Sequence, residues 1–205
     1  PIKHTFMDFE LDDRIKRSIV VKGYVTPSPI QDQSIPLILD GRDIVGIANT
    51  GTGKTAAFLL PLINKVLKNK DEQILIVAPT RELAIQIDQE FKDLSRGMGL
   101  FSVCCVGGVN IVGQLKELRY FNNFIIGTPG RLKDLIERGQ IRLEKFKTIV
   151  LDEADQMLDM GFINDMKYLV AKMPEVRHTL FFSATLSPEI ERLIGSFLNN
   201  PARVM

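Results

Sequence analysis

Residues 44–55 read Ile44-Val45-Gly46-Ile47-Ala48-Asn49-Thr50-Gly51-Thr52-Gly53-Lys54-Thr55. The apolar run at the start is typical of a buried strand, and a helical pattern follows the last two residues. Glycines permit backbone angles that turn several N–H groups inward, so this strand, turn and helix predict a loop that binds phosphate groups. Alanine stands at position 48, where the usual pattern has glycine. The alternative is a glycine-rich turn that matches by accident, and the flanking strand and helix argue against it.

Short apolar runs like the first one recur along the chain, at 44–48, 74–78, 102–106, 124–127, 148–151 and 179–183. They are nearly continuous in apolar residues, which suits strands buried on both faces. Stretches with helical periodicity separate them, such as the one with the apolar face Leu83, Ala84, Ile87, Phe91 and Leu94. This alternation predicts an α/β fold with a mainly parallel sheet flanked by helices on both faces. In such sheets ligands bind beyond the carboxyl ends of the strands.

Composition limits the protein class. The chain has 205 residues, of which 45% are hydrophobic and 25% charged, so we expect one folded domain and exclude a disordered chain. Its 26 basic and 25 acidic residues give a net charge of +1, which excludes binding of nucleic acid by overall charge alone. Two adjacent cysteines, Cys104 and Cys105, exclude a disulfide scaffold and indicate a reducing compartment. No apolar run is long enough for a membrane span or a signal core, so we expect a cytoplasmic protein.

The first 40 residues differ from the alternating part. Leu11, Ile15 and Ile19 predict a short helix that ends at Gly23, and a proline-rich turn follows it. We expect residues 1–40 to be a flanking segment of the same domain, with the main sheet built by residues 41–205.

Charged residues at two strand ends carry the predicted chemistry. Lys54 can reach the β and γ phosphates of a nucleotide, and the hydroxyl of Thr55 can bind Mg²⁺. The strand 148–151 runs into Asp152-Glu153, where Asp152 can hold Mg²⁺ through water and Glu153 can orient or deprotonate an attacking water. The alternative for these two acids is a helix start that complements the helix dipole, and the neighbouring phosphate loop disfavours it.

Six motifs carry a family resemblance over nearly the whole chain. They are Asp152-Glu153-Ala154-Asp155, Ser183-Ala184-Thr185, Pro79-Thr80-Arg81-Glu82-Leu83, Thr128-Pro129-Gly130-Arg131, Gly107-Gly108 with Gln114, and the stretch from Gly23 to Gln31 with Phe6 upstream. Together they resemble the first RecA-like domain of a DEAD-box ATP-dependent RNA helicase, a P-loop NTPase. The stretch Leu158-Asp159-Met160-Gly161-Phe162 and residues 180–185 resemble the bacterial RhlE-type branch. Three small departures from the family pattern are Asn49, Ser28 and Gly127, and none removes a group that the mechanism needs.

The resemblance implies ATP or ADP with Mg²⁺ as cofactor. The amide of Gln31 can donate to and accept from the adenine edge, which favours ATP over GTP, and Tyr24 can stack on the ring. For Gln31 a local helix cap is the alternative. The implied catalytic residues are Lys54, Asp152, Glu153, Ser183 and Thr185. The implied nucleotide contacts are Tyr24, Gln31, Asn49, Thr50, Gly51, Thr52, Gly53, Lys54 and Thr55, with Thr55 and Asp152 near the metal.

The resemblance also implies RNA as a partner. Two helices each begin with a hydroxyl residue and an arginine, and a glycine pair lies between them in the sequence. Together these groups can bind successive phosphates of an RNA backbone, with little preference for base sequence. The implied RNA contacts are Pro79, Thr80, Arg81, Gly107, Gly108, Gln114, Thr128, Pro129, Gly130 and Arg131. Ordinary helix capping is the alternative for either helix start alone.

A second RecA-like domain is implied as the other partner, because nothing after Thr185 resembles the family's later motifs. We therefore expect the chain alone to be a monomer that binds nucleotide and shows almost no RNA-stimulated hydrolysis or unwinding.

Two further functions stay open: an RNA clamp that is gated by nucleotide and hydrolyses little, and a small-molecule kinase. The intact Lys54, Asp152 and Glu153 argue against the clamp. His4 and His178 have no partners at metal-ligand spacing, so no structural metal is expected.

Overall fold

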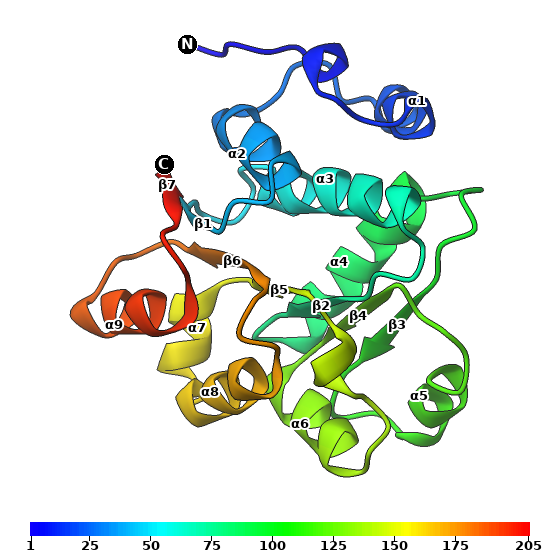
Figure 1. Ribbon diagram of the computed structural model, residues 1–205, viewed down its shortest axis with the longest axis vertical. Helices are drawn as coiled ribbons and strands as arrows, with labels where there is room; N and C mark the ends of the chain where they lie inside the picture. The colour runs from blue at the N-terminus through cyan, green and yellow to red at the C-terminus, as the bar shows by residue number, and fades with distance from the viewer.

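The computed structural model describes all residues from 1 to 205. Its centre is a seven-stranded sheet in the order β3-β4-β2-β5-β6-β1-β7, in which every pair of neighbours is parallel (Figure 1). The strands are β1 (Ile44–Ile47), β2 (Ile74–Val77), β3 (Ser102–Cys105), β4 (Phe124–Gly127), β5 (Thr148–Leu151), β6 (His178–Ser183) and β7 (Ala202–Val204). The predicted parallel α/β fold is therefore confirmed.

Nine α-helices and two 3-10 turns connect and precede the strands. The helices are α1 (Asp13–Lys22), α2 (Pro29–Leu39), α3 (Lys54–Lys68), α4 (Arg81–Leu94), α5 (Val112–Glu117), α6 (Pro129–Glu137), α7 (Ala154–Asp159), α8 (Ile163–Lys172) and α9 (Pro188–Phe197), and the 3-10 turns are η1 (Phe6–Asp8) and η2 (Leu143–Lys145). Helix α1 ends where the sequence predicts, at Gly23, whose φ of 85° is the left-handed conformation that glycine adopts without strain.

Two hydrophobic cores lie on opposite faces of the sheet. Alternate residues of each strand point to opposite faces, so Ile76 joins one core while Leu75 and Val77 join the other. Helices α1 to α4 cover the first face, and α6 to α9 cover the second (Figure 1). Helices cover both faces of the sheet, so a ligand can approach only at the ends of the strands. The loops that follow the carboxyl ends of the strands are therefore the expected binding positions.

The first 40 residues pack into the first of these cores. Phe6, Ile15 and Ile35 are among its fully or nearly fully buried side chains. The backbone N–H groups of Lys3 and His4 donate to the carboxylate of Asp32, which holds the start of the chain against α2. These contacts bring the proline-rich turn and the start of α2 close to the loop that follows β1.

The observed elements differ from the sequence predictions in a few places. Strands β1, β2 and β3 are each one residue shorter than predicted, and β6 begins one residue earlier, at His178. Helix α2 and strand β7 were not predicted at all. Ser187 caps α9 by accepting from the N–H of Ile190, whereas the side chain of Thr128 at the start of α6 makes no capping bond.

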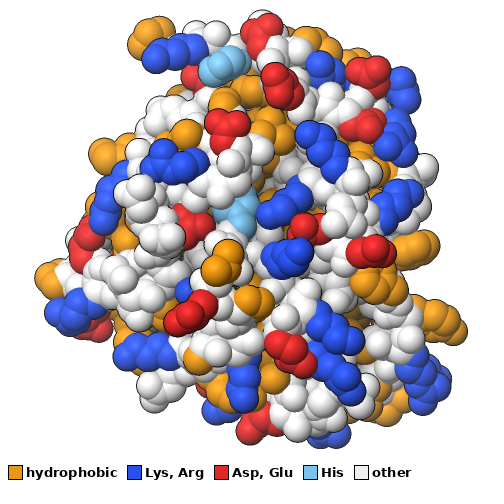
Figure 2. All heavy atoms as spheres, in the orientation of Figure 1, with side chains coloured by type: hydrophobic (Ala, Val, Ile, Leu, Met, Phe, Trp, Pro, Cys, Tyr) orange, Lys and Arg blue, Asp and Glu red, His pale blue; other side chains and the backbone are white.

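The surface carries charges of both signs. On the face shown in Figure 2, basic and acidic side chains are interspersed, which agrees with the net charge of +1. Cys104 is half-buried and Cys105 is buried, and both are free thiols. No helix in the structure combines the length and the apolar character that crossing a membrane requires.

Histidine 178 is a buried titratable group at the start of β6. Its Nε2 lies 2.6 Å from the carbonyl oxygen of Arg42, and its Nδ1 lies 3.3 Å from the ammonium of Lys65. The ammonium can only donate, so Nδ1 accepts and Nε2–H donates, which is the neutral form of the ring. Burial, and after it the charge of Lys65, lowers the pKa of His178 from 6.5 to about 4.

This lowered pKa predicts a loss of stability in acid. Below pH 6.5 the unfolded chain protonates His178 and the folded chain does not, until pH reaches about 4. The free energy of unfolding should therefore fall across that window, by about 3 kcal/mol from this residue. Denaturant unfolding of the His178→Gln variant, which keeps a donor for Arg42 and cannot titrate there, should show a smaller fall than the parent. An equal fall in the two proteins would contradict the assignment.

Candidate nucleotide and nucleic-acid site

Three adjacent strands bring the predicted catalytic residues together. Strand β6 lies between β5 and β1 in the sheet, and all three end at the same edge. The loop after β1 carries Lys54, the loop after β5 carries Asp152 and Glu153, and β6 ends at Ser183. The parallel register thus places residues that are up to about 130 positions apart in the chain at one end of the sheet.

The loop between β1 and α3 has the backbone that phosphate binding needs. Gly51 and Gly53 have φ values of 86° and 84°, in the left-handed region where glycine is unstrained. A Cβ at Gly53 would also lie 2.5 Å from Nε2 of Gln31, so only glycine fits there. The hydroxyl of Thr52 donates to the carbonyl of Asn49 and closes the turn. The free N–H groups of this turn and of the start of α3 form a binding site for anions.

Gln31 lies against this loop, and its amide makes two hydrogen bonds. Its Oε1 accepts from the N–H of Ser28, and its Nε2 donates to the carbonyl of Gly53 at 3.0 Å. The local helix cap that stood as the alternative is therefore present, together with a contact to the phosphate loop. A primary amide has a second N–H and a second lone pair, so one donor and one acceptor remain for a ligand.

Lys54, Asp152 and Glu153 form a compact charged cluster beside the loop. The ammonium of Lys54 lies 3.1 Å from Oδ1 of Asp152 and 3.4 Å from Oε2 of Glu153. The hydroxyl of Thr50 donates to the same Glu153 oxygen at 3.4 Å. Lys54 and Asp152 are buried, while Glu153 is partly exposed at the mouth of the cluster. The arrangement presents one cation and one accessible carboxylate to whatever anion the loop binds.

Asp152 is a wholly buried carboxylate without aligned hydrogen-bond donors. Both of its oxygens lack a hydrogen-bond partner, since the contact with Lys54 is an ion pair without hydrogen-bond alignment. Burial raises the pKa of Asp152 to about 6, against the opposing charge of Lys54. A buried carboxylate with unfilled lone pairs is costly, and a bound cation would offset part of that cost.

This carboxylate and a nearby hydroxyl fit a magnesium ion. Thr55 lines the same phosphate-loop region, and Mg²⁺ typically takes one or two protein ligands and completes its shell with phosphate oxygens and waters. The structure contains no cluster of three or more His, Cys, Asp or Glu residues that would form a dedicated metal cage. Asp152 and Thr55 are the residues that would hold a Mg²⁺ ion bound together with phosphate oxygens.

The backbone at Glu153 is held in an uncommon conformation. Its φ of 50° and ψ of 52° lie in the left-handed region, which a non-glycine residue rarely adopts. Glu153 precedes α7, but its side chain makes no capping bond there. The strain turns the carboxylate toward Lys54 and Thr50 instead of along the helix. The alternative of an acidic helix start that complements the dipole stays compatible with this position, because Glu153 directly precedes α7.

Asp155 connects the two motifs at the ends of β5 and β6. Its Oδ2 accepts from the N–H of Ala184 at 3.2 Å and from the hydroxyl of Thr185 at 3.1 Å. The hydroxyl of Ser183 donates to the carbonyl of Thr185 at 2.8 Å and tightens the same turn. The sequence analysis gave Asp155 no role, because only the neighbouring strand supplies its partners. Ser183 and Thr185 make no hydrogen bond to Lys54 or Glu153.

Two cavities open on either side of Lys54 and Glu153. One, of about 440 Å³, is bordered by Asn49, Thr50 and the exposed side of α7. The other, of about 360 Å³, is bordered by the phosphate loop, Tyr24 and three residues on one face of α4, namely Leu83, Gln86 and Glu90. None of these three residues is among the predicted nucleotide contacts, although their spacing along α4 places them on one face of the helix.

Tyr24 is the aromatic residue in the wall of the second cavity. Its ring stacks on Phe6 with centroids 6.1 Å apart and an interplanar angle of 24°. Phe6 is buried, while Tyr24 is half-buried and lines the cavity together with Gly53 and Thr55. An aromatic ring in the wall of a cavity beside a phosphate loop can stack on the base of a bound nucleotide.

A second group of predicted residues meets at the other half of the carboxyl edge. Strands β3, β4 and β2 are neighbours, and their ends lead into Gly107-Gly108, Thr128–Arg131 and Pro79–Arg81. Gly108 has a φ of 78°, and a Cβ there would lie 3.1 Å from the guanidinium of Arg81, so the two loops are in close contact. Thr80 caps α4 by accepting from the N–H of Leu83.

The two arginines of this group differ in their partners. Arg131 donates to Oε1 of Gln114 at 2.9 Å and to the carbonyl of Val109 at 3.1 Å. Gln114 in turn donates to the carbonyl of Val106, which joins the loops after β3 and β4. Arg81 is exposed and makes no ion pair or hydrogen bond. The group therefore combines a fixed loop framework with an unpaired cation, an arrangement that suits a phosphate chain.

Comparison with known proteins agrees with this geometry. The family model described as DEAD/DEAH box helicase matches residues 28–193. The chain is 44% identical over 200 residues to the ATP-dependent RNA helicase CshA of Limosilactobacillus reuteri and 45% identical over 200 residues to the RNA helicase CrhR of Synechocystis sp.. These matches include 97% and 98% of this chain but only 40% and 41% of the relatives, so the chain spans about two fifths of their length.

A solved structure shares the fold closely. It is a DEAD box protein from the hyperthermophile Methanococcus jannaschii, with a TM-score of 0.93 and 40% identity. The match covers 97% of this chain and 55% of that one. The seven-stranded parallel sheet is accordingly a RecA-like domain, and this chain belongs to the DEAD/DEAH box helicase family.

Proposed function

We propose that this chain is the ATP-binding half of a DEAD-box RNA helicase, in which ATP binding and hydrolysis drive RNA binding and local duplex unwinding. The observation that carries the proposal is the cluster of Lys54, Asp152 and Glu153 beside the phosphate loop. A phosphate-binding lysine, a buried acid that suits Mg²⁺ and an accessible second acid are the parts that nucleotide hydrolysis requires. The relatives named as helicases support this function over a clamp with little turnover.

The phosphate end of the nucleotide would occupy the loop from Asn49 to Thr55. The inward N–H groups and Lys54 would neutralise the β and γ phosphates, and Lys54 would exchange part of its contact with Asp152 for phosphate. Thr55 and Asp152 would hold Mg²⁺, partly through water, and the ion would withdraw charge from the phosphate oxygens. Glu153, which is partly exposed, would then orient an attacking water and accept its proton.

The base end of the nucleotide would lie near Gln31 and Tyr24. The free donor and acceptor of the Gln31 amide match the paired N6 and N7 positions of adenine, and guanine presents a different pattern at that edge. Residues 1–40 are thus proposed to be part of the nucleotide-binding unit. Their packing into the core that also contains α3 supports this.

RNA would follow the second half of the carboxyl edge. Arg81, the start of α6 and the backbone at Gly107 and Gly108 would contact phosphates and sugars, with Gln114 holding Arg131 in place. Contacts of this kind read the backbone rather than the bases. RNA binding would therefore show little sequence preference.

A second RecA-like domain of the same protein is proposed as the partner that completes both sites. Ser183 and Thr185 would couple the two domains, because Asp155 ties their turn to the strand end that also carries Asp152 and Glu153. Without that domain we expect this chain to be monomeric and to bind nucleotide with almost no unwinding.

The resemblance of Leu158–Phe162 to the RhlE-type branch supports membership of that branch, although the relatives compared with this chain are CshA and CrhR. The free thiols of Cys104 and Cys105 support a cytoplasmic location.

The base-reading role of Gln31 predicts a preference for adenine. The chain should bind ADP at least about tenfold more tightly than GDP in a fluorescence or calorimetric titration, because guanine would leave buried polar groups unpaired. In Gln31→Ala this preference should largely disappear. Gln33→Ala is the matched control, since Gln33 lies on the same helix and bonds to Met205, away from the loop. Equal affinities for the two nucleotides in the parent would refute the assignment.

Phosphate contacts by Arg81 and Arg131 predict a sequence-independent loss of RNA affinity. Replacing either with alanine should weaken RNA binding by a similar factor for unrelated sequences and reduce the slope of log affinity against log salt by about one unit. Arg138→Ala, at the opposite end of α6 from Arg131 and paired with Asp134, is the charge-matched control. A loss that depends on the RNA sequence would indicate base readout and would contradict this proposal.

A further inference from the structure

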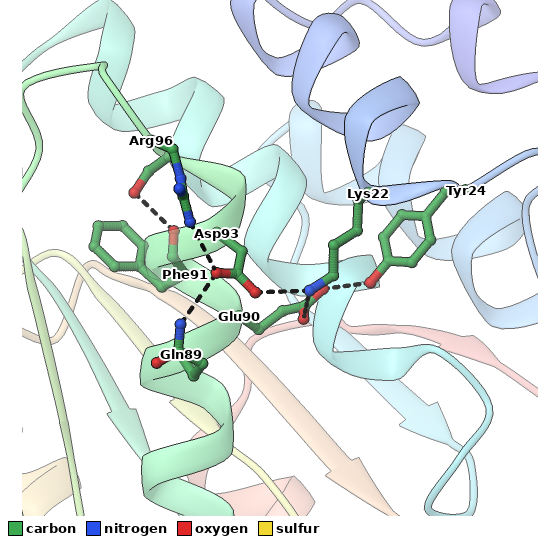
Figure 3. A network of polar contacts seen from close by, with 8 residues as sticks. Lys22, Tyr24, Gln89, Glu90, Phe91, Asp93 and Arg96 are labelled. Carbon is green, nitrogen blue, oxygen red and sulfur yellow. Dashed lines mark hydrogen bonds and ion pairs between the residues drawn. The ribbon is translucent and has the colours of Figure 1, made fainter.

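The end of α1 and one face of α4 are joined by a polar network that the proposed mechanism does not use. Lys22 and Tyr24 flank the cap residue Gly23, and Glu90 and Asp93 lie one turn apart on α4 (Figure 3). The ammonium of Lys22 lies 3.0 Å from Oε2 of Glu90 and 2.8 Å from Oδ2 of Asp93. The hydroxyl of Tyr24 donates to Oε1 of Glu90, so Glu90 holds both residues at once.

The Tyr24–Glu90 contact lies in the wall of the 360 Å³ cavity beside the phosphate loop. Both residues line that cavity, together with Gly53 and Thr55. Phe6 stacks against the Tyr24 ring and limits its movement on that side. Beyond this stacking, the hydroxyl is the only polar group of the side chain, and its single partner is Glu90.

The surroundings of the Tyr24–Glu90 hydrogen bond determine which group donates. Burial, and after it the hydrogen bond to Glu90, raises the pKa of Tyr24, so its hydroxyl stays protonated and donates. The ammonium of Lys22 contacts the second oxygen of Glu90 and so holds this carboxylate from its other side. The ring of Tyr24 is therefore held by Phe6 on one face and by the Glu90 carboxylate at its hydroxyl.

A tether between the two helices does not by itself require Glu90. Asp93 already binds Lys22, and Asp93 is further held by Gln89 at 3.0 Å and Arg96 at 3.6 Å (Figure 3). Glu90 alone of these acids reaches Tyr24 and lines the cavity. Its distinct property is therefore the orientation of the ring.

We propose that Glu90 is a positioning residue for nucleotide recognition, which holds the ring of Tyr24 in place for contact with the adenine base. The inference rests on the proposed function, since it deepens the role of the same site. Glu90 acts through Tyr24 and does not itself touch the phosphates. Its contribution should accordingly appear in the binding of the base and be absent from the binding of the phosphate groups.

The test compares ADP with inorganic pyrophosphate as probes of the same loop, by calorimetric titration with Mg²⁺. In Glu90→Ala, ADP affinity should fall about tenfold, while pyrophosphate affinity stays within about twofold of the parent. Glu90→Gln keeps an oxygen acceptor for the hydroxyl and should recover most of the loss. Tyr24→Phe should lose ADP affinity by a similar factor, and the double variant Tyr24→Phe with Glu90→Ala should lose no more than either alone, because both remove one interaction.

The control variant is Asp93→Asn, which weakens the helix tether and leaves the Tyr24–Glu90 contact in place. Its affinity for ADP should equal that of the parent. Unchanged ADP affinity in Glu90→Ala, or an equal loss for ADP and pyrophosphate, would overturn the inference and leave the proposed function intact. If the unaltered chain binds pyrophosphate but gains nothing from the adenosine portion of ADP, the proposed adenine site itself is wrong and the inference falls with it.

Discussion

The buried ion pair between Lys54 and Asp152 is the interaction on which the arrangement of this molecule depends. A carboxylate with no exposed surface and no aligned donors is unfavourable in a folded protein, and burial raises its pKa to about 6. Lys54 compensates part of this cost only because β1 and β5 are parallel and separated by a single strand. The same constraint turns Glu153 out of its helix into a left-handed conformation and leaves its carboxylate accessible. A nucleotide phosphate would supply a negative partner for Lys54, and its metal ion would supply a positive partner for Asp152.

Strand order divides the proposed site residues at the carboxyl ends of the strands into two groups. Strands β5, β6 and β1 end at the proposed nucleotide cluster, and β2, β4 and β3 end at the proposed RNA contacts. Helix α4 belongs to both halves. Its first residue, Arg81, lies beside Gly108, while Leu83, Gln86 and Glu90 face the nucleotide cavity. Tyr24 contacts α4 through Glu90, and the first residue of the same helix, Arg81, belongs to the proposed RNA contacts. A change in the position of Tyr24 would therefore act on a helix that also takes part in the proposed RNA site.

Local sequence patterns were sufficient for the parts of the structure that depend on near neighbours. The phosphate loop, strands β1 to β6 and the helix end at Gly23 all follow from apolar runs and glycine positions. Helix α2 was missed because its prolines suggested a turn, although Ser28-Pro29 repeats the start signal that Thr128-Pro129 and Ser187-Pro188 provide. Strand β7 has only three residues and gains its order from pairing with β1. Asp155 and Glu90 gain their roles from partners 30 and 66 positions away, which no local pattern contains.

The central claim is that Lys54 binds phosphate while Glu153 acts on water, and one comparison tests it most directly. RNA-stimulated ATP hydrolysis and ATP affinity should be measured together for a protein that pairs this chain with its second RecA-like domain. Lys54→Ala should lose ATP affinity, because the lysine contacts the phosphates before reaction. Glu153→Gln should keep ATP affinity and lose hydrolysis by at least about 100-fold, and the exposed Glu144→Gln should change neither. Hydrolysis at the parental rate in Glu153→Gln would contradict the account.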